Sequence, residues 1–150
     1  MHDIYVENNG PINRLTITCP MGEGENPKPV VLVGGNGSGK TSLLSSIGDA
    51  LFEAAAAHYS NVVPDQRVGH RSWFRVIGGS TISSGAPGGC SLLRFRHADK
   101  DFFYVEKGGE LDPAELKARA PAVFESAIQW GKDSSKQHSI GEQRDRKSVV

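Results

Sequence analysis

The sequence predicts an α/β fold in which a glycine-rich loop joins a buried strand to an amphipathic helix, with an antiparallel β-subdomain after them. The first observation is the β-branched, apolar run at 29–33, which is typical of a strand covered on both faces of a sheet. The second is the glycine-rich loop (residues 34–41). The third is the i, i+3, i+4 spacing of apolar residues after Thr41, which predicts a helix with one buried face.

The glycine-rich loop fills every fixed position of the phosphate-binding pattern G-x-x-x-x-G-K-[ST]. Its glycines let backbone N–H groups converge on an anion, and the helix N-terminus adds partial positive charge. We expect Lys40 to contact the β- and γ-phosphates, the Thr41 hydroxyl to hold a bridging Mg²⁺, and Ser42 to donate to the α-phosphate. The alternative is a glycine-rich turn that fits the pattern by chance. The predicted nucleotide-binding residues are Asn36, Gly37, Ser38, Gly39, Lys40, Thr41 and Ser42.

Composition limits the class of protein. A chain of 150 residues, 37% of them hydrophobic, can form one domain with a core but is short for a complete ATPase. Cys19 and Cys90 have no partners at a metal-ligand spacing, so neither a zinc site nor a disulfide framework is expected. No apolar run has membrane-spanning length and no signal-peptide pattern opens the chain, so we expect a cytoplasmic protein without membrane insertion.

Charge is spread unevenly although the formal net charge is zero. Residues 1–60 carry three Lys/Arg and six Asp/Glu, whereas the rest of the chain carries fourteen and eleven. A dedicated nucleic-acid domain is normally much more basic. Composition alone therefore does not favour contact with DNA.

Two strands are expected before residue 29. Residues 4–7 predict a short strand, which ends at turn-forming residues 8–11. Apolar and polar residues alternate over 14–19, as in a half-buried antiparallel strand. Glycine and proline then mark 20–28 as an exposed loop.

Beyond residue 70 the pattern predicts three strands, at 72–77, 91–97 and 101–107. A glycine- and serine-rich connection separates the first two, and a tight turn joins the last two. Basic side chains share strand faces here, which fits either a DNA-contacting surface or a solvated face. These side chains are Arg71 and Arg75, which flank Trp73, and Arg94 and Arg96.

The segment 112–131 has the marks of a helix. Asp112 is suited to the N-cap, Pro113 to the first helical position, and Glu115 to a hydrogen bond back to the cap. Pro121 is expected to kink the helix or to divide it into two.

The order "IYVENNGPINRLTI", a polar loop, then "VVLVGGNGSGKTSLLSSIGDAL" resembles the N-terminus of ABC-type ATPases of the RecF and SMC kind, including ATP-binding proteins of DNA repair and phage defence. The resemblance covers residues 3–55 and is most specific at 36–40, while Gly35 replaces the family's common proline. It implies part of a P-loop NTPase head that forms a homodimer around ATP. Its parts would be a P-loop core at 1–60, a β-subdomain at 70–111 and a helical segment at 112–131.

A complete head of this kind also needs an apolar strand that ends in Asp-Glu, which binds Mg²⁺ and polarises the attacking water. The sequence contains no such run, because Asp49 and Glu53 fall on the predicted helix and Asp99 and Asp101 in a turn. By its order in the chain, Gln66 is the candidate for the glutamine that contacts the γ-phosphate. The resemblance therefore implies a fragment that binds phosphates but lacks the residues for hydrolysis.

Ser139, Gly141 and Gln143 fit S-x-G-x-Q, a degenerate form of the ABC signature, whose serine and glycine contact the γ-phosphate on the other protomer from a helix N-terminus. His138 stands where leucine is usual, and a polar tail is the alternative. Two functions stay open: an ATP-driven enzyme of DNA repair or phage defence, and the ATPase subunit of a membrane transporter or another P-loop protein.

The final residues, 145–150, are expected to be non-native, which leaves 1–144 as the native domain. They can be written back codon by codon as GATCGGAAGAGCGTCGTG, a stretch of a common sequencing adapter. A genuine basic tail after a complete small domain is the alternative.

Overall fold

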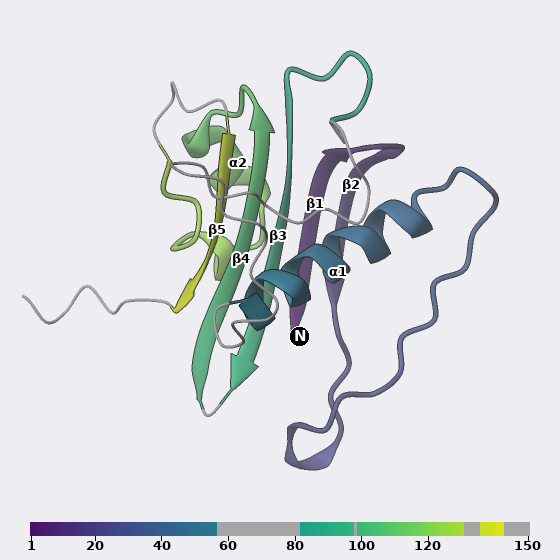
Figure 1. Ribbon diagram of the computed structural model, residues 1–150, viewed down its shortest axis with the longest axis vertical. Helices are drawn as coiled ribbons and strands as arrows, with labels where there is room; N and C mark the ends of the chain where they lie inside the picture. Colours follow the sequence, from purple (N-terminus) through teal and green to yellow (C-terminus); the bar gives the residue numbers. More distant parts are fainter. Residues whose placement is uncertain (57–81, 98, 131–135, 143–150) are drawn as a thin grey trace, which may run out of the picture.

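A computed structural model describes residues 1–56, 82–97, 99–130 and 136–142 (Figure 1). Its strands form one five-stranded sheet in the order β2-β1-β3-β4-β5, in which all neighbours are antiparallel. The strands are β1 (Asp3–Asn9), β2 (Ile12–Thr18), β3 (Gly88–His97), β4 (Lys100–Gly109) and β5 (Lys136–Glu142). The sheet thus unites strands from the predicted 1–60 and 70–111 segments.

This architecture shows that the predicted fold class, an α/β P-loop NTPase head with an antiparallel β-subdomain, is wrong, because the core of such a head is a parallel sheet. The described strands are all antiparallel, and the run 29–33 is not a strand. Val31 and Val33 are 81% and 90% exposed, although the prediction buried them in a central strand. A strand is stabilised by the hydrogen bonds of its neighbours, and none of the described strands pairs with this run. The apolar composition of the run 29–33 was therefore not sufficient to predict a strand there.

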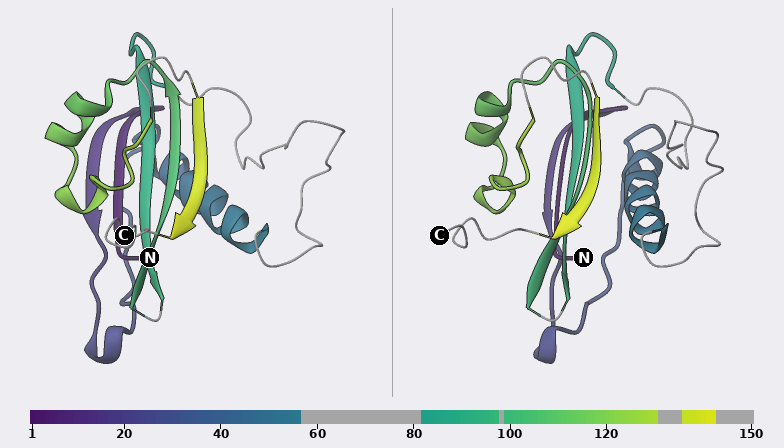
Figure 2. Two further views of the ribbon diagram at one scale, coloured as in Figure 1. Left: turned by 90° about the vertical axis from the view of Figure 1, so that its left-hand side faces the viewer. Right: turned by 60° about the vertical axis from the view of Figure 1, so that its left-hand side comes forward.

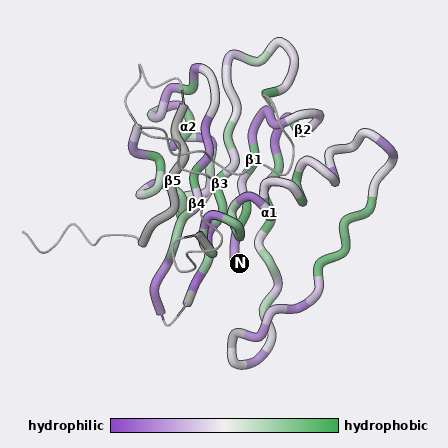
Figure 3. The backbone as a smooth tube through the Cα atoms, viewed as in Figure 1, coloured by the Kyte–Doolittle hydropathy of each residue, from purple (hydrophilic) through white to green (hydrophobic). Residues whose placement is uncertain are grey.

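The exposure of the run gives a testable prediction. In Figure 3 the chain that leads to α1 is coloured as a hydrophobic stretch. Replacing Val31 and Val33 together with serine should lower the fluorescence of the apolar dye ANS, because exposed apolar side chains are lost. The free energy of unfolding should change by about 0.5 kcal/mol or less, as for surface substitutions in general. Val105→Ser is the control, since Val105 is buried in β4 and its replacement should destabilise the protein. Equal destabilisation by the two changes would contradict the exposed placement.

Helical elements cover both faces of the sheet, so that the molecule has three layers (Figure 2). Helix α1 (Lys40–Ala56) lies on one face, and α2 (Pro113–Arg119) and the 3₁₀ turn η3 (Ala122–Phe124) lie on the other. Another 3₁₀ turn, η1 (Glu23–Glu25), lies between β2 and α1. Within the described residues, no helix combines the length and the apolar character needed to cross a membrane.

The core consists of two clusters, one on each face, because side chains alternate along each strand. In β1, for example, Ile4 and Val6 face α1 whereas Tyr5 faces α2. The α1-side cluster contains Ile4, Val6, Ile12, Leu43, Ala50, Leu93 and Tyr104. The α2-side cluster contains Tyr5, Cys90, Leu92, Phe103, Val105, Leu111, Leu116, Phe124, Ile128 and Trp130.

Most other predicted elements are confirmed. Strands are present at the predicted 4–7, 14–19, 91–97 and 101–107, and their ends differ from the predicted ends by three residues or fewer. A helix follows the glycine-rich loop, as predicted. Asp112 accepts a hydrogen bond from the Ala114 N–H at 2.8 Å, and Pro121 separates α2 from η3 as expected. The predicted strand 72–77 lies outside the described residues.

Candidate phosphate-binding site

The candidate site is the glycine-rich loop and the first turn of α1. Gly37 and Gly39 have φ values of 78° and 94°, in the left-handed region that side chains disfavour. The Leu43 N–H donates to the Gly39 carbonyl at 2.9 Å, so helical hydrogen bonding starts where the loop ends. The first N–H groups of any helix lack helical acceptors and carry partial positive charge. The loop thus leads into an end of α1 that favours anions.

Lys40, the first residue of α1, turns its side chain back into the loop. Its Nζ donates to the carbonyl oxygens of Gly34 and Gly35, each at 2.7 Å, and lies 3.4 Å from Ser38 Oγ. The Ser38 N–H also donates to the Gly35 carbonyl, at 3.3 Å. The ammonium group is therefore surrounded by neutral acceptors, which a phosphate could replace with charged oxygens.

The position of Thr41 bears on the predicted Mg²⁺. Thr41 is exposed at the start of α1, and its carbonyl accepts a hydrogen bond from Ser45 Oγ at 2.7 Å. Magnesium sites in proteins usually combine one or two carboxylates with phosphate oxygens and waters. Among the residues that the structure describes, no group of three or more His, Cys, Asp or Glu could hold a metal. An exposed hydroxyl at this position could supply one ligand to a Mg²⁺ that is already bound to phosphate oxygens.

A buried polar network fixes α1 to the sheet one turn behind the site. Asn9 Nδ2 donates to Ser91 Oγ at 2.9 Å and to Ser46 Oγ at 3.2 Å, and the two serine oxygens are 3.3 Å apart. Buried hydroxyls and amides need such partners. Sequence reasoning missed these residues. Their only local signal was a polar residue, Ser46, on the buried face of α1.

The other predicted site residues lie elsewhere. Ser139 and Gly141 are in β5, where their backbones pair with Val105 and Phe103 of β4. The resemblance implies that a signature motif lies at a helix N-terminus, whereas these two residues lie in a strand. Gln66 and Gln143 lie outside the described residues.

The basic residues of β3 form ion pairs. Arg94 donates to Asp3 at 2.8 Å and to Asp101 at 3.0 Å, and Arg96 donates to Asp101 at 3.0 Å. Burial alone would raise the pKa of Asp101, but Arg96 and Arg94 together lower it below its usual value. Arg94 and Arg96 are thus paired with carboxylates, an arrangement that neither predicted alternative, a DNA-contacting surface or a solvated face, included. Arg71, Trp73 and Arg75 lie outside the described residues, and contact with DNA stays a prediction.

The likeness to ABC-type ATPases rests on the sequence pattern of residues 3–55 and on the phosphate-binding motif within it. Comparison with known proteins adds no family to that pattern. No protein-family model matches the chain, and neither does any curated protein.

Proposed function

We propose that this protein binds ATP, with Mg²⁺, through the glycine-rich loop and the first turn of α1. The main support is the position of Lys40 Nζ, which lies 2.7 Å from two loop carbonyls at the start of a 17-residue helix. A lysine beside glycine backbone and a helix N-terminus suits a phosphate group, because the charge and the N–H dipoles act on the same anion.

Each predicted residue has a role in this proposal. Phosphate oxygens replace the Gly34 and Gly35 carbonyls as acceptors for Lys40, because a charged oxygen accepts more strongly than a neutral one. Backbone N–H groups of 36–39 surround the phosphates, Ser42 donates to the α-phosphate, and the Thr41 hydroxyl binds Mg²⁺. The nucleobase is not part of this recognition, so affinity should follow the number of phosphates.

The sequence resemblance extends the proposal to a homodimer that hydrolyses ATP to act on DNA, in repair or phage defence. An ATPase subunit of a membrane transporter is the alternative. Both extensions depend on the same loop, so ATP binding is the step to test first.

Competition binding provides that test. A fluorescent ATP analogue with Mg²⁺ should be displaced by ATP and by inorganic tripolyphosphate at similar concentrations. AMP, which lacks the β- and γ-phosphates, should need a concentration about a hundredfold higher, since it loses charge-assisted contacts to Lys40. Equal displacement by AMP and ATP, or no binding of the analogue, would overturn the proposed function.

A further inference from the structure

The turn between β1 and β2 lies directly against the end of the glycine-rich loop. A Cβ atom placed on Gly39 would be 2.4 Å from Ile12 Cγ1 and 3.3 Å from Pro11 Cγ. A Cβ on Gly10 would be 3.0 Å from Ser42 Oγ in the first turn of α1. The first of these separations is shorter than real Cβ contacts allow, so the Gly39 backbone is packed against Ile12 without space between them.

Hydrogen bonds fix this turn to the rest of the fold. The Asn8 carbonyl accepts from the Ser83 N–H at 2.9 Å, and Asn8 Nδ2 donates to the Gly88 carbonyl at 3.0 Å. Ser83 Oγ donates to the Gly10 carbonyl at 2.5 Å, and Ile12 is only 8% exposed. The turn is thus tied to the segment that leads into β3. It can act as a fixed surface for the loop.

We propose that Ile12 and Gly10 are positioning residues for the phosphate-binding loop. Glycines have wide backbone freedom, and a loop that contains several of them loses entropy when a ligand orders it. Contact with Ile12 restricts the backbone of Gly39, and the close approach of Gly10 restricts the position of Ser42. Part of the loop is therefore ordered before a ligand binds. The effect on affinity rests on the proposed function, whereas the effect on loop order does not.

Three variants test this inference. Ile12→Ala removes the Cγ1 atom that packs against Gly39, whereas Ile12→Val keeps an equivalent atom. Ile17→Ala is the matched control, because Ile17 lies on the same strand and packs on the same cluster but pairs with Ile4, far from the turn. Each variant is studied in the full chain at a temperature where circular dichroism shows it folded.

The first measurement is amide hydrogen exchange in the peptide that spans 34–43, without ligand. Exchange there should be about fivefold faster in Ile12→Ala than in Ile17→Ala, because the loop loses its packing surface. The second is ATP·Mg²⁺ affinity, which should fall about tenfold in Ile12→Ala and recover in Ile12→Val.

The outcomes separate the two proposals. Equal loop exchange in Ile12→Ala and Ile17→Ala would overturn the positioning role, whatever the protein binds. Faster exchange with unchanged affinity would show that the contact orders the loop but does not affect binding, which overturns the inference as stated. Failure of the unaltered protein to bind ATP would overturn the proposed function, and with it the affinity effect inferred here.

Discussion

Replacing Lys40 with alanine should weaken ATP·Mg²⁺ binding by about tenfold to about a hundredfold. The change removes a charge-assisted phosphate contact, which is worth about 1.5 to 3 kcal/mol. In the unliganded protein the same side chain contacts neutral oxygens at the surface, so the free energy of unfolding should change by about 0.5 kcal/mol or less. Titration of a fluorescent ATP analogue, with thermal unfolding of both proteins, measures the two quantities.

Lys28→Ala is the matched control for this prediction. Lys28 is exposed and precedes the loop, so its replacement makes the same change in net charge without touching residues 34–41. It should alter affinity less than about twofold, since one surface charge contributes little at physiological ionic strength. Equal losses in the two variants would indicate a general charge effect. Unchanged affinity for ATP·Mg²⁺ in Lys40→Ala would show that Lys40 does not contact the ligand.

Elements with local causes could be predicted from the sequence. The alternation along β2 and the cap at Asp112 and Pro113 depend on residues within one strand or one helical turn, and both are confirmed. The prediction of a strand at 29–33 was wrong because it depended on more than local sequence. The β-branched residues of this run suit a strand, but whether a strand forms depends on a partner that local sequence does not specify.

One part of the candidate site could likewise be predicted from the sequence, and another part could not. The motif places the glycines and Lys40 in one loop, and the structure agrees that a helix follows them. The contacts behind the loop come from distant parts of the chain: Asn9 reaches Ser46 and Ser91 across 37 and 82 residues. Ile12 likewise meets Gly39 only because the Ile12 side chain of β2 lies on the face of the sheet that α1 covers. No spacing rule could have revealed such contacts in a single sequence.

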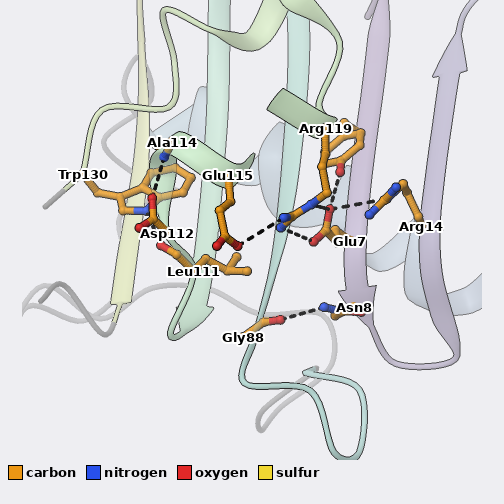
Figure 4. Close-up of polar contacts among 11 residues, drawn as sticks. Glu7, Asn8, Arg14, Gly88, Leu111, Asp112, Ala114, Glu115, Arg119 and Trp130 are labelled. Atoms are coloured by element: carbon orange, nitrogen blue, oxygen red, sulfur yellow. Dashed lines mark hydrogen bonds and ion pairs between the residues drawn. The ribbon is translucent and has the colours of Figure 1, made fainter. Parts of the chain in front are cut away.

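Arg119 of α2 contacts the sheet at Glu7, a carboxylate of β1 that is 4% exposed (Figure 4). Glu7 accepts hydrogen bonds from Arg119 Nη2 at 2.9 Å and from the Tyr5 hydroxyl, and Arg14 Nε lies 3.5 Å away. Burial alone would raise the pKa of Glu7, but Tyr5, Arg119 and Arg14 together lower it below its usual value. The folded state therefore favours the ionised carboxylate.

Replacing Glu7 with glutamine should lower the free energy of unfolding at pH 7 by about 2 kcal/mol, as for a buried hydrogen bond to a charged group. The value is below that for a fully buried ion pair, because the Arg119 side chain is 30% exposed and keeps some contact with water. Glu115→Gln is the control. Glu115 contacts the same arginine at 3.4 Å but its side chain is 71% exposed, so the loss should be about 0.5 kcal/mol or less.

The effect of Glu7→Gln should also depend on pH in a defined direction. Because the pKa of Glu7 is lower in the folded than in the unfolded protein, its contribution is fully present above the unfolded value of about 4.3 and is lost as pH falls through the folded value. The difference in unfolding free energy between the unaltered protein and Glu7→Gln should thus be constant from about pH 6 to pH 7 and shrink below about pH 4. Urea unfolding at a series of pH values measures it. A difference that persists unchanged into acid would mean that Glu7 acts through its shape and hydrogen bonds and not through its charge.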